Sequence, residues 1–281
     1  MKKILLLGNT GKMGLALTDL LKNDYVIEGK NSKDFDAENF PSVRSLIEDS
    51  KPDIVINTAA LLGIDPCEEN PEKAFQINTL YPKFLAELSN KHKFILCHFS
   101  TDAVFNDDKR YYRTEADLPA PLNIYGMTKY GGDCCIQAGT EHHYIFRIPI
   151  LFGETYKNNQ FVEKMIDFMK KKPLVRVSSD IFSSPTYSRD VAEKIKEILI
   201  DRYSYGLYHI ANRGVASLFD LMNKIKIELN LPARVESASY KDFPFKGRKN
   251  LFTPLSSSKL ISMRSWEKAV IDYCIRMKGK P

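Results

Sequence analysis

The sequence lacks the features that would place it in or across a membrane. The apolar run at residues 4–7 ends at Gly8, so it is too short for a signal peptide and is typical of a β-strand. Elsewhere no stretch approaches the ~20 consecutive apolar residues that a bilayer requires. We therefore expect neither a targeting segment nor a membrane partner.

The cysteines show no pattern of a disulfide framework. There are five of them, Cys67, Cys97, Cys134, Cys135 and Cys274, which is an odd number with no CxxC spacing. Such a set is typical of reduced thiols in an intracellular protein, because disulfides persist mainly in oxidising compartments. The sequence therefore predicts a cytoplasmic location.

Concentrated charge of one sign is also missing. The 41 basic and 35 acidic residues leave a net charge of +6, and they are spread along the chain. A nucleic-acid-binding surface would need a basic stripe, whereas a diffuse excess of this size suits a protein that binds small anions. We expect no nucleic-acid partner.

Two kinds of catalytic centre have no supporting motif. The histidines His98, His142, His143 and His209 fall on different predicted elements without HExxH spacing, which argues against a metal site. No GxSxG motif is present, so a serine hydrolase of that type is not indicated. The site is predicted to hold no metal.

What the first half does contain is an alternation of short apolar runs with amphipathic stretches. This order, with 43% hydrophobic residues in a chain of 281, predicts an α/β fold with a doubly wound, parallel Rossmann-type sheet. The series continues to a strand expected at residues 144–153. Segments 173–188 and 237–260 are rich in Ser, Pro and aromatic residues and are expected to form loops around a pocket. A final helix is expected at residues 262–278.

The alternation loosens after Gly153, which predicts two parts. Residues 1–152, with return segments near 187–212, are expected to form an NAD(P)-binding Rossmann domain. Residues 153–186 and 213–281 are expected to form a smaller C-terminal substrate-binding part.

The segment "GNTGKMG" places Gly8, Gly11 and Gly14 between the first strand and the first helix. Glycines allow a tight turn and a close approach of the backbone to a pyrophosphate, which then lies on free N–H groups at the helix N-terminus. The spacing is GxxGxxG, not GxGxxG. Its position nevertheless favours a dinucleotide loop over a simple turn.

The residues about 20 positions further on bear on the choice of cofactor. Glu28 is placed by count to hold the ribose 2′-hydroxyl of NAD, but Lys30, Asn31 and Ser32 follow it, and this small, cationic group suits a 2′-phosphate. NADP(H) is therefore favoured and NAD(H) remains open. The alternative is that Lys30 is only a solvated loop residue.

Two further strand ends carry candidate residues. Ala59 and Ala60 follow a predicted strand and are small enough for a cofactor to lie close to the backbone, or simply to pack there. Ser100, Thr101 and Asp102 end the next one, at the edge where open α/β sheets bind ligands. Such hydroxyl and carboxylate groups are also common as turn caps.

Tyr125 and Lys129 lie four residues apart in "PLNIYGMTKYGGD", on one face of a predicted helix. An ammonium near a phenol favours the phenolate and lowers a pKa that is otherwise ~10. The spacing alone is common, so an exposed pair is the alternative. The glycine loop and the "STD" strand end favour a proton donor, Tyr125, with Lys129 as its partner.

In this order the glycine loop, "STDAVF" and "YGMTK" resemble the extended short-chain dehydrogenase/reductase superfamily. Longer segments, "PDIVINTAALLGIDPCEENPEKAFQINTLYP", "FSTDAVFNDDKRYYRTEADLPAPLNIYGMTK", "DIFSSPTYSRDVAEKI" and "GLYHIANRGVASLFDL", look like the dTDP-4-dehydrorhamnose reductase family. The resemblance implies that Thr101 orients the substrate carbonyl, Tyr125 protonates its oxygen and Lys129 holds the nicotinamide ribose. A nucleotide-linked keto sugar would then receive a hydride from NAD(P)H at C4.

The resemblance also assigns two sets of binding residues. The cofactor-binding set is Gly8, Thr10, Gly11, Lys12, Met13, Gly14, Lys30, Asp36, Ala59, Ala60, Leu61, Asn78, Ser100, Tyr125 and Lys129. Within it, Asp36 matches an adenine-side position and Asn78 a structural helix position near the nicotinamide. The substrate-binding set is Asp102, Val104, Ile148, Phe161, Thr253 and Ser256.

Three positions depart from the family pattern. Pro149 and Ile150 replace a polar-aromatic pair, and Thr253 replaces an arginine that would engage the nucleotide diphosphate. The substitutions leave the nucleotide and the sugar open, with three other cations as candidate phosphate partners: Lys246, Arg248 and Lys249. Ala16 stands where some family members have a glutamate that holds magnesium between subunits. A metal-bridged dimer is therefore unsupported, and another kind of homodimer remains open.

Three functions follow from these observations. The first is an NAD(P)H-dependent reductase of the 4-keto group of a nucleotide-activated deoxy sugar, in the synthesis of a surface polysaccharide precursor. An epimerase with the same catalytic residues is the second. The third is a non-catalytic subunit, because the family resembles the regulatory subunit of methionine adenosyltransferase. The complete set of Thr101, Tyr125 and Lys129 favours an enzyme.

Overall fold

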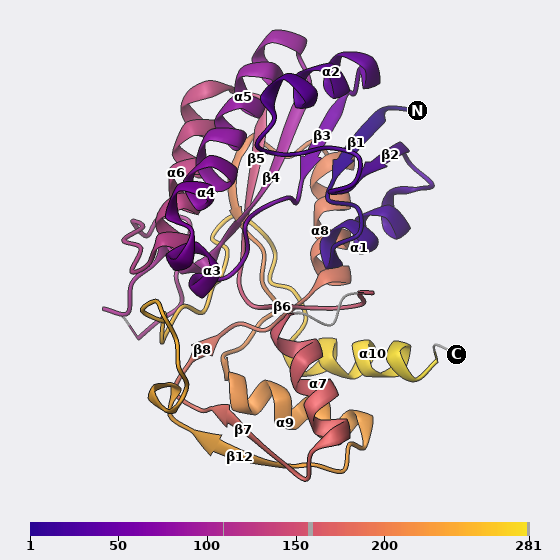
Figure 1. Ribbon diagram of the computed structural model, residues 1–281. Coiled ribbons are helices and arrows are strands. Elements are labelled where there is room, and N and C mark those ends of the chain that lie inside the picture. Colours follow the sequence, from indigo (N-terminus) through magenta and orange to yellow (C-terminus); the bar gives the residue numbers. More distant parts are fainter. Residues whose placement is uncertain (109, 157–159, 280–281) are drawn as a thin grey trace.

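A six-stranded parallel sheet forms the centre of the upper half of the molecule in Figure 1. The computed structural model describes residues 1–108, 110–156 and 160–279. The sheet has the order β10-β5-β4-β3-β1-β2. Its strands are β1 (Lys3–Leu7), β2 (Val26–Lys30), β3 (Ile54–Asn57), β4 (Ile95–Thr101), β5 (His143–Ile148) and β10 (Gly206–His209). The predicted parallel, Rossmann-type sheet is confirmed.

Helices cover both faces of this sheet, and the alternation of strand residues explains why. In β1, Ile4 and Leu6 contribute to the core under α1 and α8, whereas Leu5 and Leu7 contribute to the core under α2 and α5. Strands buried on both faces read as continuous apolar runs. The helices concerned are α1 (Lys12–Leu21), α8 (Ser188–Ile200), α2 (Phe40–Ser50), α5 (Tyr81–His92) and α6 (Ile124–Gly139).

Short helices and turns connect these elements at the carboxyl edge of the sheet. α3 (Ile64–Glu69) and α4 (Pro71–Phe75) lead into a π-helical turn, η1 (Gln76–Leu80), which runs directly into α5. A 3₁₀ turn, η2 (Asp102–Val104), follows β4. π-helical turns are rare and are frequent at functional sites.

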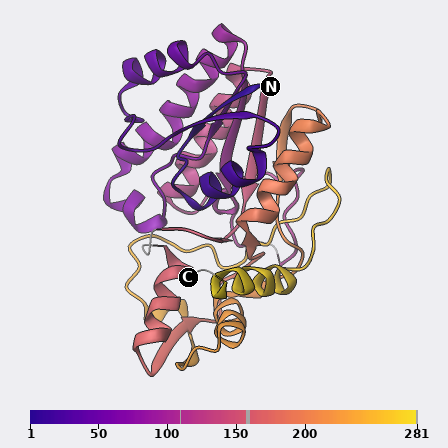
Figure 2. The ribbon, with the colours of Figure 1, turned by 90° about the vertical axis from the view of Figure 1, so that its right-hand side faces the viewer.

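A second hydrophobic core is formed by elements that lie below the sheet in Figures 1 and 2. Phe152, Tyr187, Trp266 and Tyr273 are its large aromatic members. The helices of this half are α7 (Phe161–Lys171), α9 (Leu218–Leu229), α10 (Trp266–Lys278) and the 3₁₀ turn η3 (Tyr240–Asp242). Its short strands are β6 (Leu151–Phe152), β7 (Leu174–Ser178), β8 (Phe182–Ser183), β9 (Thr186–Tyr187), β11 (Ala216–Ser217) and β12 (Arg234–Ala238). The separate core supports the division at residues 152–153, which stays a prediction.

The sequence misplaced three elements. The strand expected at residues 144–153 is two strands, β5 and β6, because Pro149 has no N–H to donate to a ladder. Residues 174–178 were expected to form a loop. They form strand β7, which pairs with β12 about 60 residues further on in the chain. The final helix starts at Trp266, later than expected. Among the described residues, no helix is long and apolar enough to span a bilayer.

Candidate active site

The glycine loop lies where the order of the sheet reverses. β2 pairs with one side of β1, and β3 pairs with the other side. This reversal of strand order makes the end of β1 a topological switch point, where open α/β sheets bind ligands. Gly8 has φ +95°, and a Cβ there would lie 2.3 Å from Thr58 Oγ1. Gly14 is equally constrained, since its Cβ would lie 2.3 Å from Gly8 O. Both glycines are therefore required for the close packing of loop and helix.

The start of α1 offers free backbone donors to an anion. Gly11 is the residue before the helix and no side chain caps the first turn, which includes the predicted residues Lys12 and Met13. Asn9 covers Gly29 of β2, and its Oδ1 is buried with no hydrogen-bond partner among the described residues. Uncapped N–H groups and an unpartnered amide oxygen fit a dinucleotide.

The side chain of Lys12 does not face this loop. It is 4% exposed, its Nζ lies 2.9 Å from Glu163 Oε2 on α7 and donates to Leu151 O. Only the backbone of Lys12 is therefore available to a phosphate, and its ammonium instead joins the two halves of the molecule. Ala16, one turn further on, is buried in the core.

The side chains at the end of β2 bear on the choice between NAD(H) and NADP(H). Glu28 is held inside the strand by Lys3 at 2.9 Å and by the Ser50 hydroxyl at 2.8 Å, so it does not extend to the edge. These contacts, chiefly the hydrogen bond from Lys3, lower the pKa of Glu28 to about 2. Lys30 ends the strand, 28% exposed and 3.0 Å from Glu28. Asp36 is exposed and accepts from Glu38 N in the following loop.

The end of β3 is tied to the helical layer by Asn78 of η1. Asn78 Oδ1 accepts from Leu61 N at 2.9 Å, and Asn78 Nδ2 donates to Leu61 O and to Thr128 Oγ1. Ala59 and Ala60 stay partly exposed beside it. Asn78 thus fixes the loop that follows β3, and its place near a nicotinamide stays a prediction.

Tyr125 is placed by the N-terminus of α6. Asn123 caps the helix by accepting from Gly126 N at 2.8 Å, and Ile124 N donates to Glu68 Oε1 of α3. A Cβ on Gly126 would lie 2.2 Å from Ala103 O, so only glycine permits this approach to the turn after β4. This approach brings the side chain of Tyr125 near that of Thr101.

The acid–base properties of Tyr125 differ from the expectation. Desolvation raises the pKa of Tyr125 well above its usual 10, while the nearby Thr101 hydroxyl acts in the opposite direction. Lys129 does not lower it, because Lys129 Nζ is directed to His98 Nε2 at 3.0 Å and to Phe99 O at 2.6 Å. The expected lowering of the phenol pKa by Lys129 is thus wrong for this state of the site.

Behind these residues lies a buried ion pair that the sequence did not reveal. Arg147 Nε of β5 lies 3.1 Å from Asp133 Oδ2 of α6, and the Ser100 hydroxyl donates to the same oxygen. The hydroxyl of Ser100 is therefore turned toward α6, which does not support its predicted contact with a cofactor. The pair links β4, β5 and α6 just below the catalytic edge.

Asp102 connects the catalytic edge to the lower half. Its carboxylate accepts hydrogen bonds from Thr101, Ser183 and Thr253, the last at 2.7 Å. Thr253 is buried, so its hydroxyl cannot also bind a diphosphate as the family's arginine would. Thr253 and Asp102 are positioned at the predicted substrate side, but Thr253 acts through Asp102.

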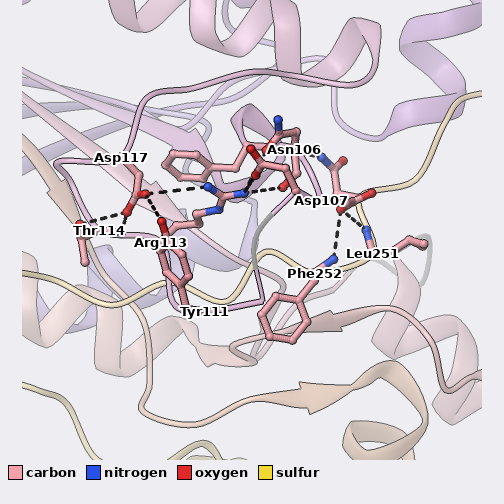
Figure 3. A network of polar contacts seen from close by, with 11 residues as sticks. Asn106, Asp107, Tyr111, Arg113, Thr114, Asp117, Leu251 and Phe252 are labelled. Atoms are coloured by element: carbon pink, nitrogen blue, oxygen red, sulfur yellow. Dashed lines mark hydrogen bonds and ion pairs between the residues drawn. The ribbon is translucent and has the colours of Figure 1, made fainter.

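A loop after β4 anchors the segment that carries Thr253 (Figure 3). Asp107 Oδ1 accepts from Leu251 N at 2.6 Å and from Phe252 N at 3.2 Å. The buried Arg113 holds the loop itself, donating to Asn106 O and Oδ1, while its backbone N–H donates to Pro254 O. Segment 251–256 is thus held on both sides of Thr253.

The structure places the other four predicted substrate-binding residues in different surroundings. Ile148 pairs with Thr101 in the sheet and is partly exposed at the edge, and its substrate contact stays a prediction. Val104 is completely buried against Phe105 and Leu255, so a substrate contact of its side chain is wrong. Phe161 packs on the second core, and Ser256 lines a separate cavity of about 270 Å³ beside His209.

The sequence reasoning missed several polar residues that build the site. They are Asn57, Glu68, His98, Asn123, Asp133, Arg147 and Ser183. One signal was visible for His98, which is a polar residue in the middle of an otherwise apolar buried strand. Charged or polar groups in such positions are rarely accidental, since burial is costly unless they are hydrogen-bonded.

The sequence matches the family described as RmlD substrate binding domain over residues 1–278. The spore coat polysaccharide biosynthesis protein SpsK of Bacillus subtilis is 31% identical over 278 residues, covering 97% of each chain. The dTDP-4-dehydrorhamnose reductase of Aggregatibacter actinomycetemcomitans is 29% identical, covering 96% of this chain and 97% of that one.

Solved structures agree with these relatives. A dTDP-4-dehydrorhamnose reductase from Bacillus anthracis, in complex with NADP, has a TM-score of 0.92 at 28% identity, covering 98% of this chain and 99% of that chain. A Thermus thermophilus UDP-glucose 4-epimerase, at 15% identity and a TM-score of 0.83, shares the fold. The chain therefore belongs to the family described as RmlD substrate binding domain, together with the dTDP-4-dehydrorhamnose reductases.

Proposed function

We propose that this protein is an NADPH-dependent reductase of the 4-keto group of a nucleotide-linked deoxy sugar, acting in the synthesis of a surface polysaccharide precursor. The observation that carries the proposal is the placement of Tyr125 and Thr101 near the buried Lys129, at the carboxyl edge of a nucleotide-binding sheet. A phenol is protonated at neutral pH, so Tyr125 can donate a proton to a carbonyl that is being reduced.

NADPH fits the residues of the site better than NADH. The glycine loop and the uncapped start of α1 would hold the pyrophosphate, and the loop fixed by Asn78 would lie under the nicotinamide half. Lys30 ends β2 where a 2′-phosphate would lie, while Glu28 is held away from the edge by Lys3. When bound, NADPH supplies the hydride for the reduction.

The diphosphate of the substrate requires a cation other than the missing family arginine. Lys246 is paired with Glu69 at 2.6 Å and Lys249 with Asp65 at 3.3 Å, which leaves Arg248. Arg248 is exposed, forms no ion pair within the described ranges, and its carbonyl accepts from the helix-capping Asn123. We therefore assign the diphosphate contact to Arg248. The homodimer and the cytoplasmic location stay predictions.

A panel of 4-keto-6-deoxy sugar nucleotides carrying dTDP, UDP, GDP or CDP tests the proposal. We expect one NADPH to be oxidised for each sugar reduced, with one nucleotide preferred. A changed sugar without net NADPH consumption would indicate an epimerase. No turnover across the panel, with a partner enzyme that copurifies, would indicate a non-catalytic subunit and contradict the proposal.

A further inference from the structure

Two buried asparagines, here called the amide pair, join three segments of the chain at the candidate active site. Asn123 precedes α6, and Asn250 lies 127 residues further on, in the loop that leads to Thr253. They are 4% and 9% exposed. Asn123 Nδ2 donates to Asn250 Oδ1 at 2.9 Å and to Arg248 O at 2.9 Å. Asn250 Nδ2 in turn donates to Phe105 O at 2.6 Å, so the two amides form one continuous set of hydrogen bonds.

The orientation of the amide pair follows from one backbone group. Gly126 N–H can only donate, so the atom of Asn123 that lies 2.8 Å from it must be the amide oxygen. The NH₂ group of Asn123 then faces Asn250 and only donates, so the atom of Asn250 opposite it must also be an oxygen. This leaves the NH₂ group of Asn250 for Phe105 O, which only accepts. Reversing either amide would place N–H against N–H, so the buried pair has a single geometry.

Each of the three segments carries a part of the proposed site. The first contains Arg248, the proposed partner of the substrate diphosphate. The second is the turn after Thr101, whose Oγ1 accepts from Ala103 N at 3.1 Å. The third is the start of α6, with Tyr125 in its first turn. The amide pair therefore lies between the substrate-binding segment and both catalytic side chains.

The first turn of α6 depends on contacts outside the helix. The N–H groups of a first turn have no partners within their own helix, and here Gly126 N donates to the side chain of Asn123. At its other end the same side chain is held by Arg248 O and Asn250. A displacement of this loop segment therefore also displaces the cap and the first turn of α6, which contains Tyr125.

We propose that Asn123 and Asn250 are positioning residues, which align Tyr125 with Thr101 when the substrate diphosphate engages Arg248. The inference rests on the proposed function and adds that contacts remote from the keto group serve kcat as well as KM. The reason is geometric, because an acid displaced by about 1 Å from its carbonyl transfers a proton far more slowly. Neither asparagine needs to touch the reacting atoms.

Hydrogen exchange measured by mass spectrometry tests this link without turnover. The probes are dTDP, UDP, GDP and CDP, each added to the protein with NADP⁺ present. The diphosphate that binds should slow amide exchange about tenfold in residues 246–250 and in residues 124–127, but not in residues 132–139 at the end of the same helix. Protection confined to residues 246–250 would overturn the proposal. Protection of neither segment by any probe would instead contradict the diphosphate contact itself, and with it the proposed function and this inference.

Asn123→Ser separates the contacts of the amide pair from the cap. Serine is a favoured N-cap and can still hold the first turn, but its side chain is too short to donate to Asn250 and Arg248 O. We expect the diphosphate to protect the Arg248 segment but no longer the first turn of α6. We also expect kcat to fall about tenfold, with KM for NADPH within about twofold of wild type. Asn39→Ser, at the exposed cap of α2, is the matched control and should change neither.

A double-mutant cycle with Arg248→Ala gives a readout that a purely structural role would not move. In the wild-type background Arg248→Ala should raise KM for the sugar nucleotide and also lower kcat about fivefold. In the Asn123→Ser background it should raise KM alone. If urea unfolding shows that Asn123→Ser does not fold, Asn250→Ser, which leaves the cap intact, replaces it in the cycle. Equal effects of Arg248→Ala on kcat in both backgrounds would contradict the proposal.

Discussion

The two sides of the candidate active site are held in different ways. On the catalytic side, buried side chains on regular elements pair with one another, as Asp133 does with Arg147 and Ser100. On the substrate side, surface loops are fixed by carboxylates that accept from backbone N–H groups, as Asp107 does from Leu251 and Phe252.

The difference indicates which parts of the site can vary. A buried ion pair leaves an uncompensated charge when one partner is lost, so the catalytic side tolerates little change. A loop held through its backbone keeps its path when side chains that do not anchor it change, so the substrate side tolerates more variation. The following changes should affect stability on one side and substrate binding on the other.

Asp133→Asn should cause the largest loss of stability. It removes the charge that faces Arg147 in a completely buried site, and we expect the free energy of unfolding to fall by about 3 kcal/mol. Urea unfolding at pH 7 measures it. Asp167→Asn, which breaks an exposed pair with Lys171, is the control and should cost less than about 0.5 kcal/mol. Equal losses in both variants would remove the distinction between the two sides.

Asp107→Ala should affect binding more than folding or chemistry. Without the two hydrogen bonds from Leu251 and Phe252, segment 251–256 loses an anchor worth about 1–2 kcal/mol. We expect KM for the sugar nucleotide to rise about tenfold while kcat changes less than about threefold. Asp242→Ala, at an exposed pair with Arg176, should leave both unchanged. A fall in kcat with KM unchanged would show that the loop serves the chemistry instead.

Lys30→Ala should change the cofactor preference. Loss of one cation near the 2′-phosphate is expected to raise KM for NADPH about fivefold and to leave KM for NADH nearly unchanged. Steady-state kinetics with each cofactor make the comparison, with Lys33→Ala, in the loop that follows β2, as the control. An equal effect on both cofactors would mean that Lys30 acts only through its contact with Glu28.

Glu28→Gln should have the smallest effect and a defined pH dependence. Because the folded pKa of Glu28 is lowered to about 2, its charged form stabilises the protein above the unfolded pKa near 4.5, and this contribution is lost as the pH falls toward 2. Glu28 is 29% exposed, so we expect a difference below about 1 kcal/mol at pH 7. Urea unfolding at pH 7 and at pH 3 should show the difference shrink. A difference that grows at pH 3 would contradict this sign.

The sequence predicted the parts of the molecule that depend on local pattern. The alternation of short apolar runs with amphipathic stretches predicted the parallel sheet and the helices that cover it. The segment "GNTGKMG" and the residues Thr101, Tyr125 and Lys129 lie at the carboxyl edge of that sheet, as expected. These signals lie within single elements. Physical constraints on backbone approach, such as those at Gly8 and Gly126, leave a trace in the sequence because only glycine satisfies them.

The sequence could not predict contacts between distant segments. Thr253 and Asp102 are 151 residues apart, and Lys12 pairs with Glu163 across the two halves. The fold determines whether Thr253 faces a substrate or a buried carboxylate. It also determines that Lys129 Nζ faces His98 and Phe99 O. Val104 was misassigned for the same reason, because burial is a property of the packed structure.

The central claim is that Tyr125 donates the proton in a ketone reduction. The most direct measurement compares NADPH oxidation by Tyr125→Phe and Tyr130→Phe, two variants of the same helix that each lose one hydroxyl, with the preferred sugar nucleotide. Loss of a general acid predicts that Tyr125→Phe lowers kcat by about 10²–10⁴-fold, while Tyr130→Phe stays within about twofold of wild type. Wild-type turnover by a folded Tyr125→Phe protein would contradict the account.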